Sequence, residues 1–493
     1  MNAQLRNRVS RLRPPTVSAA FLAGALVVGS SGGAARAQSA PPGAPPPAEA
    51  EDAAEAAPPP VVAKVPPAVA PALPSGTGVT ASLYGFVELD AIHDSTQSFT
   101  EAITNNTMAR PGTLAGDNPR TQFSARDSRV GLALSAPTYG GVRTSGRVEV
   151  DFFGNEPLGT TEDVTYSASA VRLRHAFVKF ETPVLDVLTG LTNDLFAWGG
   201  AGFYPNTVAF LGVPGEIYHR DPQVRLSKLL TNSYVTFEAA AAAVRPLQRD
   251  AEIPDGQGGL RIAFERWRGT SAQGAGLPKS AAASLGVSGV YRRFVVPAFT
   301  ATAANPNKAN GWGAAVNLFL PIIPASSAEN LGNSLSATAE ATIGTGISNL
   351  YTSLTGGVAF PVLPNPAMTL PVPVYIPDID PGLVTYDAAG NLKTVNWRAL
   401  VVGLQYRAPF GNGKKLGLAA LASQLESTNV VDLTPTQGRS FVFKKAQYVD
   451  GSLFFSPTPE TQIGASVQIE RQWFGDDVYG TNLRGELAVY YFF

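Results

Sequence analysis

The side chains best suited to chemistry in this 493-residue sequence are arginines that recur at alternate positions within short segments. They are Arg129, Arg143, Arg147, Arg172 and Arg174. On neighbouring β-strands such side chains stand about 5 Å apart, and guanidinium groups at that spacing repel one another unless water, carboxylates or anions compensate. Glu149 and Asp151 share this face and would neutralise part of the charge. The pattern predicts a basic ladder that concentrates small anions in a narrow passage. The alternative is a set of ion pairs that only stiffens a wall.

The sequence offers little material for catalysis or for binding a metal. It has no cysteine and three histidines, which are His93, His175 and His219. The lack of cysteine excludes disulfides, thiol nucleophiles and thiolate ligands, and no phosphate-binding loop, zinc-protease motif or EF-hand is present. We therefore expect no catalytic residue, no cofactor and no metal. A hydrolase stays open as an alternative, because catalytic triads are recognised by geometry and not by sequence position.

The elements that would position the arginines are short segments in which apolar and polar residues alternate. No apolar run of about 20 residues follows Ser82, which excludes membrane-spanning helices. Sixteen alternating segments lie at about 82–93, 126–136, 141–154, 168–182, 185–192, 222–229, 233–244, 258–267, 281–293, 311–321, 333–345, 395–408, 414–425, 440–456, 460–474 and 481–493. An even number is typical of bacterial outer-membrane barrels. The sequence predicts an all-β fold, a transmembrane antiparallel up-and-down β-barrel of 16 strands.

The two faces of the predicted strands differ in polarity. Val148 and Val150 flank Glu149, for example, so one face would contact lipid and the other would line an interior that must hold water. A soluble β-sandwich also alternates, but its charged face would meet bulk water. The last segment alternates in the same way and ends at Phe493. We expect Phe493 to be the assembly signal for the barrel-assembly machinery.

Short and long connections alternate between the predicted strands, as they do at the inner and outer ends of membrane barrels. The third long connection, residues 193–221, combines glycines and aromatic residues with five acidic or basic side chains. These are Asp194, Glu216, His219, Arg220 and Asp221. We expect this connection to fold into the lumen with its acids facing the arginines; the alternative is an ordinary surface loop. His175 falls on the outward face, which indicates either a subunit interface or a one-residue slip that places it in the lumen.

The first 78 residues differ in composition from the rest of the chain. A basic start, an apolar run and an Ala-Arg-Ala sequence predict a signal peptide over residues 1–37. The Pro/Ala-rich residues 38–78 cannot bury a core, so we expect a disordered periplasmic leader, either a spacer that touches the cell wall or an inert one. Residues 79–493 would form the barrel. Residues 1–37 hold five of the 37 Lys and Arg residues and none of the 38 Asp and Glu residues. The acidic balance of the remainder argues against a nucleic-acid partner.

Several motifs resemble the DcaP-like porins of Gram-negative bacteria over about residues 82–228. They are Leu83-Tyr84-Gly85-Phe86-Val87-Glu88-Leu89-Asp90, Asp127-Ser128-Arg129-Val130-Gly131-Leu132, Glu149-Val150-Asp151-Phe152-Phe153-Gly154, Leu173-Arg174-His175-Ala176 and Pro222-Gln223-Val224-Arg225. The resemblance implies a homotrimer of sixteen-stranded barrels, an inward third loop and passive uptake of small anions such as dicarboxylates. Arg129, Arg147 and Arg174 match the family pattern best. The Pro/Ala-rich leader departs from it, because members often begin with a periplasmic coiled coil.

Together these features predict a porin in the outer membrane of a Gram-negative bacterium, and not an enzyme. We expect a water-filled channel for the passive diffusion of small polar solutes, with a preference for anions. Its partners would be outer-membrane lipid, lipopolysaccharide and small anionic solutes. The alternative is a barrel that acts as an adhesin or receptor through its long extracellular loops.

Overall fold

The computed structural model describes residues 78–102, 108–154, 169–198, 208, 213–248, 251–271, 278–297, 306–352, 354 and 379–493. All of them belong to one compact unit. The predicted signal peptide and all but the last residue of the predicted leader lie outside the described residues.

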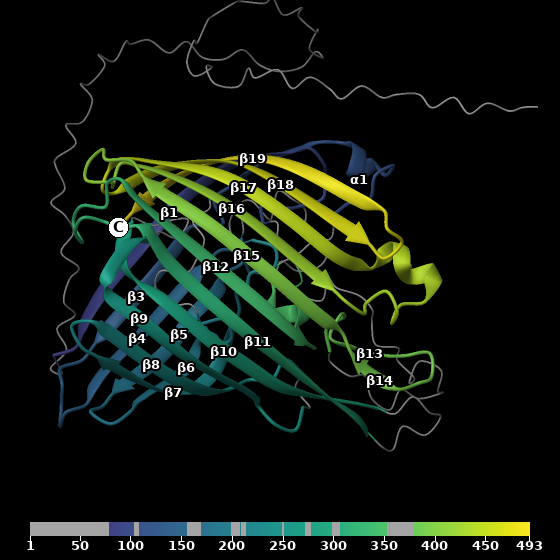
Figure 1. Cartoon of the computed structure of the whole chain (residues 1–493), viewed down its shortest axis with the longest axis horizontal. Helices are drawn as coiled ribbons and strands as arrows, with labels where there is room; N and C mark the ends of the chain where they lie inside the picture. Colours follow the sequence, from purple (N-terminus) through teal and green to yellow (C-terminus); the bar gives the residue numbers. More distant parts are fainter. Residues whose placement is uncertain are drawn as a thin grey trace, which may run out of the picture. The chain divides into compact units, whose positions relative to one another are not determined.

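Seventeen of the described strands form one antiparallel sheet that closes on itself, because β1 pairs with β19 (Figure 1). Its strands are β1 (Thr80–Asp94), β2 (Arg120–Ser124), β3 (Arg129–Ser135), β4 (Arg143–Asp151), β5 (Arg172–Glu181), β6 (Asp186–Asn193), β7 (Arg220–Thr231), β8 (Val235–Val244), β9 (Asp255–Ser271), β10 (Lys279–Pro297), β11 (Pro306–Ile323), β12 (Ser334–Thr345), β15 (Asn396–Arg407), β16 (Leu416–Ser427), β17 (Phe443–Thr458), β18 (Thr461–Phe474) and β19 (Tyr479–Phe492). Because β2 and β3 both pair with β1 along one line, the 17 strands occupy 16 positions in the wall. The predicted barrel is confirmed.

Each of the sixteen predicted segments corresponds to one position in the wall. The strands β9, β10 and β11 are longer than predicted, so their two short-side connections shrink to residues 272–278 and 324–333. The predicted second segment, residues 126–136, contains β3 alone, and the same wall position also includes β2, which precedes that segment. The sequence did not predict the hairpin of β13 (Val384–Tyr386) and β14 (Leu392–Thr394), which forms a two-stranded sheet of its own at the end of the wall (Figure 1).

Helical structure is short in the described part of the chain. It consists of α1 (Leu114–Asp117) and the 3₁₀ turns η1 (Ser348–Leu350) and η3 (Thr436–Phe441). No described helix has the length and hydropathy needed to cross a membrane.

The outer face of the wall is apolar and exposed. Val148 and Leu173, on neighbouring strands, each leave 46 % of their surface uncovered, and similar side chains recur around the barrel. A patch of this extent is unfavourable in water and is normal against lipid. On the opposite face of β4, the carboxylate of Asp151 is buried. The charged face therefore points inward, which excludes the soluble sandwich.

Part of the interior is filled by packed apolar side chains. Ile217, Leu350 and Tyr351 come from long connections and are buried against the inner face of β15, where they surround Trp397. Apolar side chains enter the barrel there because the connections carry them in, and strand alternation gives no sign of that.

The seam of the barrel is where the last residue meets the first strand. Phe493 and Gly85 exchange two backbone hydrogen bonds of 3.1 Å. The phenyl ring lies over Gly85 on the outer face, so a Cβ atom at residue 85 would stand 2.9 Å from the ring and would collide with the carbonyl oxygen of Arg129. Glycine is needed at residue 85 because the backbone of Arg129 and the ring of Phe493 leave no room for a Cβ atom.

Replacing Gly85 with valine should weaken closure of the barrel. Overpacking of this kind costs about 1–3 kcal/mol, so the G85V variant should unfold in denaturant at lower concentration than the parent protein in detergent micelles. Gly485 is the matched control, since it also faces outward but a Cβ atom added there would have no neighbour within 4 Å. Equal stability of G85V and G485V would contradict the role of the crowded seam.

Candidate functional site

The basic wall predicted from the sequence forms on the inner face of β3, β4 and β5. Arg129 lies opposite Asp151 across β3 and β4, and Asp151 lies opposite Arg172 across β4 and β5. A bulge in β5 leaves Arg174 without a cross-strand partner, and His175 lies opposite Glu149. Both Arg174 and His175 therefore point inward.

His175 is a lumen residue and not part of a subunit interface. It is 8 % exposed, and its Nδ1 atom lies 3.0 Å from the hydroxyl oxygen of Thr192. The bulge at Arg174 supplies the one-residue slip that the sequence left open.

The centre of the wall is a buried network of ion pairs. Arg174 is 2 % exposed and donates from Nε to Glu149 and from Nη1 to Asp151, both at 2.8 Å. Arg172 approaches Asp151 at 2.6 Å. Arg172 and Arg174 therefore form ion pairs that stiffen the wall, because their guanidinium groups hold both carboxylates in fixed positions.

Positive charge nevertheless exceeds negative charge in this part of the lumen. Arg129 is 3.6 Å from Glu149, which Arg174 already holds, and the exposed Arg147 lies over the ring of Tyr84. Arg220, the first residue of β7, adds a further guanidinium. Atom Nε of Arg129 and Nη1 of Arg220 are buried and have no hydrogen-bond partner among the described residues.

Tyr218 responds to this surplus charge. Its hydroxyl accepts a hydrogen bond of 2.9 Å from Arg174, and the guanidinium of Arg220 lies 5.1 Å from the ring centre. Burial alone would raise the pKa of Tyr218, but the charges of Arg174, Arg220 and Arg129 outweigh it and lower the pKa to about 7. The surroundings thus favour negative charge on a group that is ordinarily neutral.

Arg143 is not part of this group. It lies 3.7 Å from Glu181 at the short-turn end of β4, and 60 % of its side chain is exposed. The structure therefore brings together four of the five predicted arginines and adds Arg220 from the predicted loop set.

Sequence reasoning missed two tyrosines of the site. Besides Tyr218, it missed Tyr84, whose hydroxyl donates to Glu149 at 2.7 Å. The ring of Tyr84 lies across Gly131, where a Cβ atom would collide with it. The sequence did hold a signal for Tyr84, because its position two residues before Phe86 places it on the inward face of the first strand.

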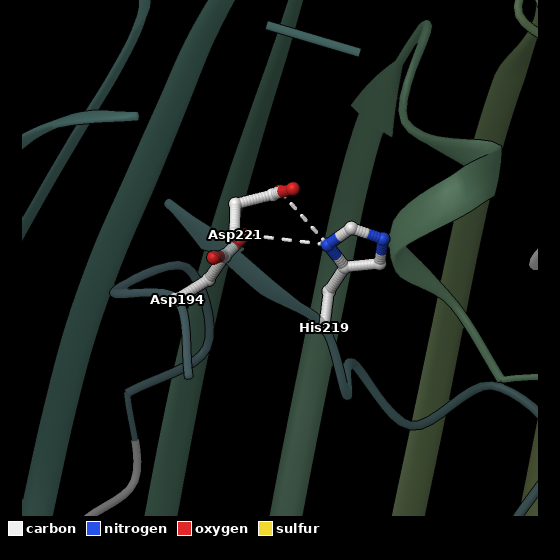
Figure 2. Close-up of side chains that lie close together, drawn as sticks. All are labelled: Asp194, His219 and Asp221. Atoms are coloured by element: carbon white, nitrogen blue, oxygen red, sulfur yellow. Dashed lines mark ion pairs between the residues drawn. The ribbon is translucent and has the colours of Figure 1, made fainter. Parts of the chain in front are cut away.

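Asp194, His219 and Asp221 meet where the third long connection leaves β6 and enters β7 (Figure 2). The Nδ1 atom of His219 lies 2.9 Å from Asp221 and 3.7 Å from Asp194. Burial opposes the charged imidazole, but the two carboxylates outweigh burial and raise the pKa of His219 to about 10. The three groups are close enough to hold a metal, yet an imidazole protonated at neutral pH is a cation and a poor ligand. They form an ion-paired clasp that joins the two ends of the connection.

Residues 213–219 extend from this clasp to the inner faces of distant strands. The amide of Ile217 donates to Glu340 on β12 at 2.8 Å, and Ser423 on β16 donates to the carbonyl of Pro214 at 2.6 Å. Glu216 is fully buried, and burial raises its pKa to about 8. Glu216 lies near Glu340 and not against the arginines, so the loop acids do not stand in a row opposite the basic wall.

Loss of Arg174 should destabilise the barrel far more than loss of Arg143. Removing one partner of a buried ion pair costs about 3–5 kcal/mol, and R174M leaves Glu149 and Asp151 short of donors. R143M removes an exposed pair, worth about 1 kcal/mol or less. The free energy of unfolding in detergent micelles measures both, and equal losses would contradict the assignment of Arg174 to the buried network.

The clasp should weaken in alkali. The pKa of His219 in the folded chain, about 10, exceeds the ordinary value of 6.5, so the charged imidazole contributes its full stabilisation below pH 6.5 and loses it as the pH rises through about 10. The difference in unfolding free energy between the parent and H219Q should therefore shrink from neutral pH to about pH 11. A difference that does not change with pH would show that His219 is uncharged in the fold.

No protein-family model matches this chain, and no curated protein matches it significantly. Among solved structures, the outer membrane channel DcaP of Acinetobacter baumannii aligns with a TM-score of 0.59 and 17% identity over 85% of this chain and 99% of that one. OprB of Pseudomonas putida aligns with a TM-score of 0.44 and 10% identity over 85% and 94% of the two chains. OmpT of Vibrio cholerae aligns with a TM-score of 0.43 and 10% identity over 85% and 99%.

The likeness to DcaP concerns the fold. It agrees with the architecture implied by the motifs between residues 82 and 228, with the apolar outer face and with the closed wall. The chain has the fold of a sixteen-stranded outer-membrane channel.

Proposed function

We propose that the chain is a porin that admits small polar solutes by passive diffusion and favours anions such as dicarboxylates. The observation that carries this proposal is the charge of the lumen wall around Tyr218. Five guanidinium groups gather there with two carboxylates, and the charges of three of them, Arg174, Arg220 and Arg129, lower the pKa of Tyr218 to about 7. The five are Arg129, Arg147, Arg172, Arg174 and Arg220, and the acids are Glu149 and Asp151.

The arginines of the wall have different roles in attracting an anion. Arg174 is buried and holds both carboxylates, so it is a positioning residue. Arg129 and Arg172 keep about a quarter of their side chains exposed, and Arg147 is open to the lumen. A passing anion would interact with these three, and fixed charges next to a low-dielectric wall act over a longer range than charges in bulk water.

The connection of residues 193–221 supports selectivity in this proposal by narrowing the passage. Its described residues bond to the inner faces of β12 and β16, and the clasp at His219 fixes its two ends. Tyr218 and Arg220 then stand beside the basic wall, which brings solutes close to the guanidinium groups.

The proposed setting is the outer membrane of a Gram-negative bacterium, after export and removal of residues 1–37. Lipopolysaccharide is a proposed partner of the outer face. Lys445 lies over the ring of Trp473, and Arg471 lies over Tyr479, at the long-connection end of β17 to β19. Cations beside interfacial aromatic rings suit anionic headgroups.

Assembly as a homotrimer rests on the family resemblance, and recognition of Phe493 by the barrel-assembly machinery rests on its place at the seam.

Neutralising the exposed arginines of the wall should reduce anion preference. In planar bilayers with a salt gradient, the parent protein should give a reversal potential on the anion side. The triple variant R129Q/R147Q/R172Q should move it towards the cation side, because the wall loses three charges and keeps Glu149 and Asp151.

The matched control removes three arginines that lie outside the basic wall. Arg143 lies at the turn end, and Arg398 and Arg471 lie on the outer face. The variant R143Q/R398Q/R471Q should keep the parent reversal potential, and equal shifts in both triple variants would refute the role of the wall. Folded protein without conductance would instead favour the adhesin or receptor.

A further inference from the structure

Three carboxylates converge inside the barrel at a place that the proposed porin function does not use. Glu88 and Asp90 lie on β1, and Asp127 lies in the turn between β2 and β3. Their exposed fractions are 2 %, 0 % and 1 %. One oxygen from each lies within 4.8 Å of the others.

The backbone is shaped to bring Asp127 into this group. Asp90 pairs with Ser124 and Phe86 pairs with Arg129, so four residues of the β2–β3 line lie opposite three residues of β1. The extra residue makes a turn in which the amide of Ser128 donates to the carbonyl of Ala125 at 3.2 Å. The amide of Glu88 donates to the hydroxyl of Ser128 at 3.0 Å, which holds the turn against β1.

No cation among the described residues forms an ion pair with these acids. The nearby arginines pair elsewhere: Arg484 holds Asp94 at 2.8 Å, Arg126 approaches Glu101 at 3.4 Å, and Arg129 approaches Glu149. Both carboxylate oxygens of Asp90 and Oδ1 of Asp127 are buried without a hydrogen-bond donor in the described part of the chain. Burial of unpaired carboxylates is costly, and a bound cation is a usual remedy.

We propose that Glu88, Asp90 and Asp127 bind one divalent cation of the Ca²⁺ type. Ca²⁺ prefers carboxylate oxygens at about 2.3–2.6 Å, so oxygens on opposite sides of one ion are separated by about 5 Å or less. The observed limit of 4.8 Å fits that requirement. Ligands from β1 and from the β2–β3 turn would cross-link the wall beside the seam, since β1 also pairs with β19.

The competing explanation is that the three carboxyl groups stay uncharged by sharing protons. The two explanations differ in what stabilises the fold. A cation site predicts saturable binding and a stabilisation that depends on Ca²⁺, whereas shared protons predict no response to Ca²⁺.

The test uses the full-length mature chain, folded in detergent and stripped with a chelator. Tb³⁺ substitutes for Ca²⁺, and Tyr490, which lies opposite Glu88 on β19, is placed to sensitise its luminescence. We expect saturable binding of one ion per chain, displacement by Ca²⁺, and a rise in unfolding temperature with Ca²⁺. In D127N, binding should weaken at least about tenfold.

The control is D450N, because Asp450 is also buried in the lumen but accepts hydrogen bonds from Tyr448 and Ser452. It should bind Tb³⁺ as the parent does. E88Q replaces D127N if the latter does not fold, and the titration of the parent needs neither variant. No saturable binding up to millimolar Ca²⁺, or equal binding by D127N and the parent, would overturn the proposal.

Discussion

Hydrocarbon offers no partner for a backbone amide or carbonyl, and this constraint governs the whole molecule. A sheet can meet it only by closing, and here it closes through β1 and β19 at Gly85 and Phe493. Closure separates two media, so each strand must alternate between apolar and polar side chains. The charges of the lumen are tolerable because their side of the wall is shielded from lipid.

Inside the barrel, the arrangement of charge matters more than its amount. Glu149 and Asp151 would cancel much of the basic wall if they were free to move, but Arg174 holds both of them. Arg129 and Arg147 are thereby left with few acidic partners. The resulting excess of positive charge lowers the pKa of Tyr218. The buried ion-pair network and the excess of positive charge beside it are therefore parts of one arrangement.

Much of this architecture follows from local sequence, and the remainder depends on tertiary contacts. Alternation with period two located all sixteen strand positions and the inward side of Arg129, Arg147, Arg172 and Arg174, because each strand faces the same two media along its length. It could not locate the breaks in that period between β2 and β3 and at Arg174. It also missed the role of Tyr218, whose hydroxyl contacts Arg174 on a strand 44 residues away. It missed the surroundings of Glu216 too, because the neighbouring residues Pro214 and Ile217 bond to β16 and β12, more than a hundred residues away. Arg143 shares the parity of the ladder but lies at the end of its strand, and parity carries no information on depth.

The bulge in β5 has a consequence for how such a wall can change. An extra residue in a regular strand moves every later side chain to the opposite face of the sheet, so that lipid-facing side chains would face the lumen. At the bulge the chain absorbs the addition, since Leu173 before it and Val178 after it both stay outside. The lumen has gained the cation of Arg174 while both halves of the strand remain in phase, so a strand of this kind can acquire one more inward group by insertion without a second, compensating deletion.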